Sequence, residues 1–245
     1  MKKIISTFKY ILLLLILCFS PFCLALVVES ALTGGNVTLT YQFIMLPTLA
    51  GTLISAYIFR KENIAHIKSA KPHINTLICC AAAGISLNPL ILSILHFAIS
   101  LNINYGDMTA WNYISPIIVA PLAEEIIFRG LLTDILDKTF PKKKYSFILV
   151  ILLTSLSWAL IHLYGIGLST LLVFIDGIIL GFIYYHYKNI IYCIIYHSAV
   201  NASVLLMRFL SGSTWIVCTA LSAVILFASV AIIIKDRKEN TTIYS

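Results

Sequence analysis

Charged side chains are scarce in this chain of 245 residues, where they make up 11% against 60% hydrophobic residues. The mean hydropathy is +0.97, and a soluble domain of this size cannot bury so much apolar surface. Segments of about ten residues with alternating polarity, typical of membrane strand barrels, are also absent. The apolar runs last about 18 to 25 residues, the length that a helix needs to cross a bilayer. The sequence therefore predicts an all-α, polytopic transmembrane helical bundle.

Cysteine spacings typical of metal or disulfide sites are missing as well. The six cysteines lie in or beside apolar runs, and no two of them form a C-x-x-C pair. We interpret them as small packing residues, since a zinc site or disulfide framework requires a characteristic ligand spacing.

The positive charges indicate how the chain is oriented in the membrane. Of the 17 Lys and Arg, all except Arg129 and Arg208 lie at the N-terminus, in alternate loops or in the C-terminal tail. This is the distribution expected of cytoplasmic segments, so we predict a multi-pass protein of the cell membrane with both termini cytoplasmic. It also accounts for the net charge of +7, and we expect no nucleic-acid partner. About eight spans fit this alternation, namely residues 8–28, 39–59, 74–101, 108–127 with an extension to 140, 145–163, 168–187, 190–209 and 214–234.

One apolar run contains three charged residues within six positions. Glu124, Glu125 and Arg129 lie in A-P-L-A-E-E-I-I-F-R-G, and a charge at mid-membrane costs about 2.5 to 3.5 kcal/mol on insertion scales. Glu125 and Arg129 are four residues apart and can form an ion pair on one helix face, while Glu124 points about 100° away. Glu124 is therefore left for chemistry.

Two further polar pairs lie on other predicted spans, each spaced to share a helix face. Trp158-x-x-x-His162 is in the fifth span and His197-x-x-x-Asn201 in the seventh. A lone histidine in a membrane is more often structural than catalytic. Together with the glutamate pair and the arginine, however, these residues indicate a site that activates water.

The motif order resembles a known protease family. E-E-x-x-x-R, then aromatic-x-x-x-H, then H-x-x-x-N, each on its own span, is similar to the CPBP family of intramembrane proteases, also called the type II CAAX prenyl endopeptidase or Abi family. The glycine-containing segment 176–185 is similar to the family's helix between the histidine motifs, and the resemblance covers residues 116–202. Trp158 stands where the family usually has phenylalanine, which we expect to affect packing more than chemistry.

The resemblance implies an endopeptidase that cleaves a peptide or a lipidated protein in or at the bilayer. Glu124 looks like the general base that activates water, and His162 like a second group that holds this water. His197 and Asn201 look like donors to the oxyanion, and the Glu125 and Arg129 pair like a support. A divalent metal such as zinc, held by Glu124, His162 and His197, is the alternative to glutamate catalysis, and we favour the metal-free form slightly.

On this basis we divide the chain into four segments. Residues 1–28 form an N-terminal signal-anchor helix or a cleaved signal peptide, and we favour the retained anchor because the apolar run continues to Val28. Residues 29–107 supply accessory helices, 108–209 the catalytic core, and 210–245 the last helix with a basic cytoplasmic tail.

Two other functions remain possible on the sequence alone. The chain can be a catalytically idle immunity or membrane scaffold protein in which the same residues form a structural polar network. It can also be a transporter, although no inverted repeat or paired broken helices support this. The motifs H-E-x-x-H, G-x-G-D and G-x-S-G of other intramembrane proteases are absent. The sequence does not identify the substrate.

Overall fold

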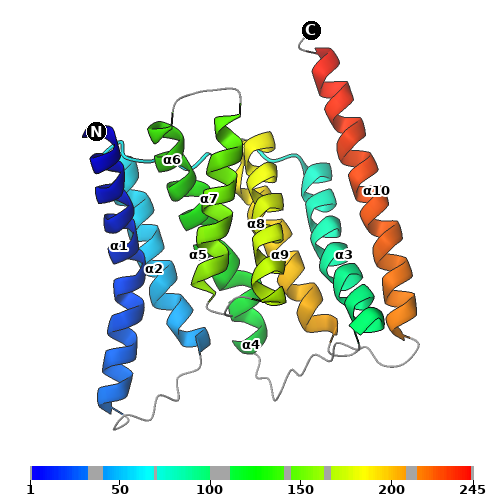
Figure 1. Cartoon of the computed structure of the whole chain (residues 1–245), viewed down its shortest axis with the longest axis horizontal. Helices are drawn as coiled ribbons and strands as arrows, with labels where there is room; N and C mark the ends of the chain where they lie inside the picture. Colours follow the sequence, from blue (N-terminus) through cyan, green and yellow to red (C-terminus); the bar gives the residue numbers. More distant parts are fainter. Residues whose placement is uncertain are drawn as a thin grey trace. The chain divides into compact units, whose positions relative to one another are not determined.

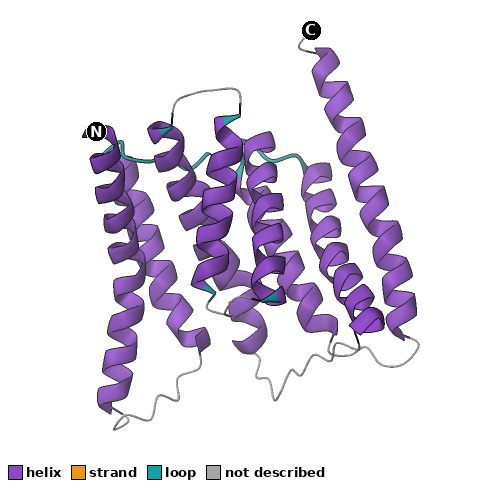
Figure 2. Ribbon diagram, viewed as in Figure 1, coloured by secondary structure: helices purple, strands orange, loops and turns teal. Residues whose placement is uncertain are grey.

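The computed structural model of the protein describes residues 2–32, 41–68, 71–99, 111–140, 145–162, 167–207 and 214–243. Helices make up nearly all of these residues, and none of them lies in a β-strand (Figure 2). The predicted all-α helical membrane bundle is therefore confirmed.

The helices follow the predicted spans closely (Figure 1). The long ones are α1 (Lys2–Leu32), α2 (Tyr41–Lys61), α3 (Ile74–Ile99), α7 (Ser146–Ile161), α8 (Leu168–Tyr187), α9 (Ile190–Leu206) and α10 (Thr214–Ile243). The fourth predicted span and its extension correspond to a helical run of five parts, α4 (Trp111–Ile114), η1 (Ser115–Val119), α5 (Ala120–Glu125), η2 (Ile126–Leu132) and α6 (Thr133–Thr139).

Four of the described helices are long and apolar enough to cross a membrane. These segments are Ile5–Val28 in α1, Ile74–Leu95 in α3, Leu168–Tyr187 in α8 and Thr214–Ile232 in α10. Helices α7 and α9 are apolar but shorter. The chain is thus a helical membrane protein, while the count of eight spans and their orientation remain predictions.

Contacts divide the chain into two compact units that are discontinuous in sequence. The first comprises residues 1–70 and 119–193, and the second residues 71–118 and 194–245. In the first unit, α1 packs on α2 and α7 on α8, and the run from α5 to α6 contacts all four of these helices. Residues 119–136 are all buried except the half-buried Leu122, so this run is the core of the first unit. The four-segment division of the sequence remains a prediction.

In the second unit, α3 packs against α10 along its length. Gly84 of α3 also lies against the backbone of α9, because a β-carbon at Gly84 would lie 2.4 Å from the carbonyl oxygen of Tyr196. Small residues allow such close helix packing within membranes.

The segment 64–68 after α2 is bound to the ends of α6, α8 and α9 by its backbone. The carbonyl of Ile64 accepts from Nζ of Lys138 at 3.0 Å, and the N–H of His66 donates to Oδ2 of Asp134 at 2.9 Å. Lys68 donates its N–H to the Tyr184 hydroxyl at 3.3 Å. Asp134 is buried and paired with the more exposed Lys138 at 2.9 Å.

Candidate active site

Glu125 and Arg129 form the ion pair that their spacing predicts. Nη1 of Arg129 lies 2.9 Å from Oε1 of Glu125, and the two side chains are 1% and 0% exposed. Nη2 of Arg129 also donates to the carbonyl oxygen of Gly177 in α8 at 3.3 Å. Removing one partner of such a pair would leave the other charge buried and uncompensated. Through the hydrogen bond of Arg129 to Gly177, the pair also holds η2 against α8.

The neighbouring carboxylate of Glu124 has different partners. It is buried in α5, and its Oε2 accepts a hydrogen bond from Nε1 of Trp158 in α7 at 2.5 Å. The two adjacent glutamates therefore point to different helices, as the helical angle of about 100° between successive residues predicts.

His162 follows the last residue of α7 and faces Glu124. Its Nδ1 lies 2.8 Å from the carbonyl oxygen of Trp158, and because a carbonyl only accepts, Nδ1 must carry the hydrogen. Nε2 lies 3.9 Å from Oε2 of Glu124. This is too long for a direct hydrogen bond but leaves a separation that one bridging water can span.

Trp158 is the residue of this site whose role we did not predict. Its N–H binds Glu124, its ring lies 4.5 Å from Cζ of Arg129, and its carbonyl binds His162. The expectation that tryptophan at this position affects packing more than chemistry stays a prediction, while these contacts show that the residue also reaches polar groups. The donor group was evident from the sequence, but its direction depends on how α7 is rotated against α5.

The glycine in α8 that binds Arg129 also sets the distance between α7 and α8. A β-carbon on Gly177 would lie 2.9 Å from Cβ of Ser155 and 3.1 Å from Cε3 of Trp158. Because glycine has no side chain, α7 and α8 can approach each other closely at Gly177. This approach brings the carbonyl of Gly177 to Arg129 and allows Trp158 to contact Glu124.

Two π-helical segments flank the glutamates. The segments Ser115–Val119 and Ile126–Leu132 leave only the six residues of α5 between them in the α conformation. After the second segment, both the N–H and Oγ1 of Thr133 donate to the carbonyl of Phe128, five residues earlier. Such widened turns often occur at functional sites, and the hydrophobic periodicity does not reveal them.

His197 and Asn201 lie on α9 in the second unit, whereas Glu124 and His162 belong to the first. His197 is buried, and Asn201 is half-buried with its Nδ2 donating to the carbonyl of Pro116 at 2.7 Å. In a π-helical turn the partner of this carbonyl would be the residue five positions later, but that residue is Pro121, which has no N–H. The second amide hydrogen of Asn201 is left for another acceptor.

A metal centre of three protein ligands is the alternative to glutamate catalysis at this site. No three His, Cys, Asp or Glu side chains among the described residues are grouped so as to hold a metal ion. Glu124 and His162 could supply two ligands, and Oε2 of Glu124, the atom facing His162, also accepts the Trp158 N–H. The metal alternative also requires His197, which belongs to the second unit, and it stays a prediction.

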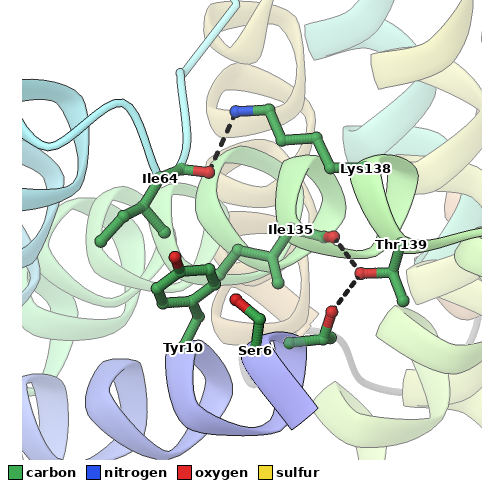
Figure 3. Close-up of a pocket in the computed structure, with 7 residues that line it drawn as sticks. Ser6, Tyr10, Ile64, Ile135, Lys138 and Thr139 are labelled. Atoms are coloured by element: carbon green, nitrogen blue, oxygen red, sulfur yellow. Dashed lines mark hydrogen bonds between the residues drawn. The ribbon is translucent and has the colours of Figure 1, made fainter. Parts of the chain in front are cut away.

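A pocket of about 200 Å³ lies elsewhere in the first unit (Figure 3). Residues of α1 and α6 line it together with Ile64, and no predicted site residue does so. A hydrogen bond of 2.5 Å between Thr7 and Thr139 joins the two helices at its edge. We assign the site by its side-chain chemistry and not by this pocket.

Comparison with known protein families agrees with the motifs. Residues 106–203 match the model of the family described as type II CAAX prenyl endopeptidase Rce1-like. The match includes all six predicted site residues and confirms the family resemblance drawn from the three motifs. No curated protein and no solved structure matches the chain.

Proposed function

We propose that this chain is an intramembrane endopeptidase in which Glu124 activates water. Its residues 106–203 match the type II CAAX prenyl endopeptidase Rce1-like family. The observation that carries the proposal is the pairing of the buried Glu124 carboxylate with Nε2 of His162 at 3.9 Å. The family supports a membrane endopeptidase acting on peptide or prenylated protein substrates. The residue roles are our inference.

The hydrogen on Nδ1 of His162 determines how the two residues act together. In the neutral ring, Nε2 then carries a lone pair and accepts a hydrogen bond. A water between Glu124 and His162 directs one hydrogen to each of them, so a lone pair of its oxygen is left to attack a substrate carbonyl.

The reaction is a hydrolysis in two proton transfers. The water oxygen bonds to the carbonyl carbon while Glu124 takes one water proton, and the carbonyl oxygen becomes an oxyanion. His197 and the second amide hydrogen of Asn201 are the donors that we assign to this oxyanion. The oxyanion then re-forms the carbonyl as the C–N bond breaks, and Glu124 gives its proton to the leaving nitrogen. The products are a carboxylic acid and an amine, which become a carboxylate and an ammonium when the acid proton passes to the amine.

The pair of Glu125 and Arg129 has a supporting role. Arg129 holds η2 against α8 through Gly177 and lies over the ring of Trp158. The pair therefore fixes the position of the Glu124 backbone relative to the Trp158 indole, and we assign it no contact with the water.

The test is cleavage of a peptide that ends in a farnesylated cysteine and three further residues, by protein purified into lipid nanodiscs. We expect release of the three residues, detected by mass spectrometry, with one oxygen-18 atom in the new carboxylate when the reaction runs in labelled water. Glu124→Gln should lower kcat at least a hundredfold, as expected for a general base. The exposed Glu62→Gln is the matched control and should leave it unchanged.

Two outcomes would contradict the proposal. If Glu124→Gln cleaves the peptide as the parent does, Glu124 is not the base. If the parent cleaves neither farnesylated nor unmodified peptides, and Glu124→Gln keeps the cellular role of a folded parent, the scaffold alternative is correct. Loss of activity in a strong chelator, restored by zinc, would instead favour the metal alternative.

A further inference from the structure

A single residue of α7 contacts three of the polar site residues of the first unit. Trp158 donates its N–H to Glu124, places its ring against the Arg129 guanidinium and accepts from His162 through its backbone carbonyl. Trp158 is 3% exposed, so water screens these interactions little. The three contacts use three different parts of one residue.

These contacts separate what the ring does from what the indole nitrogen does. Any aromatic ring can lie against Arg129, and any residue supplies the carbonyl that binds His162. Only the indole N–H reaches the carboxylate oxygen of Glu124, at 2.5 Å. Phenylalanine, the usual residue of the resembled family at this position, would keep the first two contacts and lose the third.

The oxygen that Trp158 binds is also the one that faces the histidine. Oε2 of Glu124 is 2.5 Å from the indole nitrogen and 3.9 Å from Nε2 of His162. A carboxylate can rotate about its last side-chain bond, since this torsion is broad. A donor fixed in the rigid indole plane removes this freedom and keeps one oxygen toward His162.

We propose that Trp158 is a positioning residue that holds the Glu124 carboxylate, through its indole N–H, in the orientation where Oε2 faces His162. The catalytic consequence rests on the proposed function of Glu124. The hydrogen bond itself does not, and it is tested separately.

The first experiment observes the indole directly. The chain has three tryptophans, so Trp111→Phe with Trp215→Phe leaves Trp158 as the only indole. In protein labelled with nitrogen-15 at the indole, we expect a downfield N–H resonance that exchanges slowly with water. Glu124→Gln should move this resonance and speed its exchange, whereas the exposed Glu62→Gln should change neither. An unchanged resonance in Glu124→Gln would overturn the proposal, whether or not the protein is a protease.

The second experiment measures peptide cleavage. Trp158→Phe should lower kcat about ten- to a hundredfold, which corresponds to one hydrogen bond to a charged group, and leave KM within about twofold. Trp158→His, which restores a ring N–H donor, should recover part of kcat. Trp215→Phe, in α10 of the second unit, is the control and should match the parent. A Trp158→Phe variant with the parent's kcat, or an equal loss in both Trp158 variants, would overturn a positioning role.

A failure of the proposed function looks different from a failure of this inference. If the parent cleaves no peptide but its indole resonance responds to Glu124→Gln, the protease proposal fails. The inference that Trp158 holds the Glu124 carboxylate is then still supported. If the parent cleaves the peptide and the resonance does not respond, the protease proposal stands and the role of Trp158 is wrong.

Discussion

Gly177 and Ser155 touch across helices α8 and α7. A β-carbon built on Gly177 would lie 2.9 Å from Cβ and 3.1 Å from Cα of Ser155. The Cα belongs to the backbone of α7 and cannot move without the helix. Since the carbonyl of Gly177 also binds Arg129, this contact sets the position of both α7 and the buried arginine.

We therefore expect Gly177→Ala to push α7 and α8 apart and to weaken the Arg129 contact. Overpacking of this kind costs about 1 to 3 kcal/mol. The unfolding midpoint in detergent micelles should fall, and so should peptide cleavage, because Trp158 lies 3.1 Å from the added carbon. Gly167→Ala is the control, since apart from its chain neighbours no described residue has an atom within 4 Å of the added carbon there. Equal midpoints for the two variants would show that α7 and α8 are not in close contact.

The ion pair predicts a non-additive effect on stability. Arg129→Met alone leaves the Glu125 carboxylate buried without its cation, and Glu125→Gln alone leaves the guanidinium without its anion. Each single change should lower stability by about 3 to 5 kcal/mol, measured as resistance to denaturation in mixed micelles. The double variant should lose less than the sum of the two. Strict additivity would mean that the two charges do not interact.

The part of the site that could be predicted from the sequence depends on contacts within one helix. The Glu125 and Arg129 pair follows from a spacing of four, and the same spacing places His162 one turn after Trp158, whose carbonyl it contacts. Helical periodicity determines both, whatever the tertiary structure. The helix boundaries were predictable for a similar reason, because apolar runs end where polar residues begin.

The contacts between helices could not be predicted in the same way. The bond from Trp158 to Glu124 depends on the depth and rotation of α7 against α5, and the spacing within either helix determines neither. If the helices were straight, counting from Lys138 to Glu124 and from Lys144 to His162 would place the two site residues at membrane depths about 6 Å apart. The structure nevertheless brings His162 to within 3.9 Å of Glu124. The π-helical segments shift the register of this run in a way that residue spacing does not show.

Lys188 ends α8 in a left-handed conformation with φ of 51°. Glycine adopts this conformation without strain, while alanine pays about 1 to 2 kcal/mol. Lys188→Gly should therefore be more stable than Lys188→Ala, and both variants lose the same contact of Nζ with the Tyr185 ring. At the exposed helical His186 the order should reverse, because alanine favours a helix by about 1 kcal/mol over glycine. The two pairs of unfolding midpoints test this, and the same order at both positions would contradict it.

The hydrogen bond from Asn201 to the carbonyl of Pro116 predicts a loss of stability that a second change relieves. Asn201→Leu removes the donor, and an unsatisfied, partly buried carbonyl costs about 1 to 3 kcal/mol. Pro121→Ala adds a backbone N–H five residues after Pro116, which is the spacing of a π-helical hydrogen bond to that carbonyl. The double variant should regain part of the unfolding midpoint in detergent but none of the cleavage, because the proposed oxyanion donor is still missing. Asn75→Leu, at an exposed position of α3, should cost less than about 0.5 kcal/mol. If Asn201→Leu is as stable as this control, the carbonyl of Pro116 does not need the asparagine.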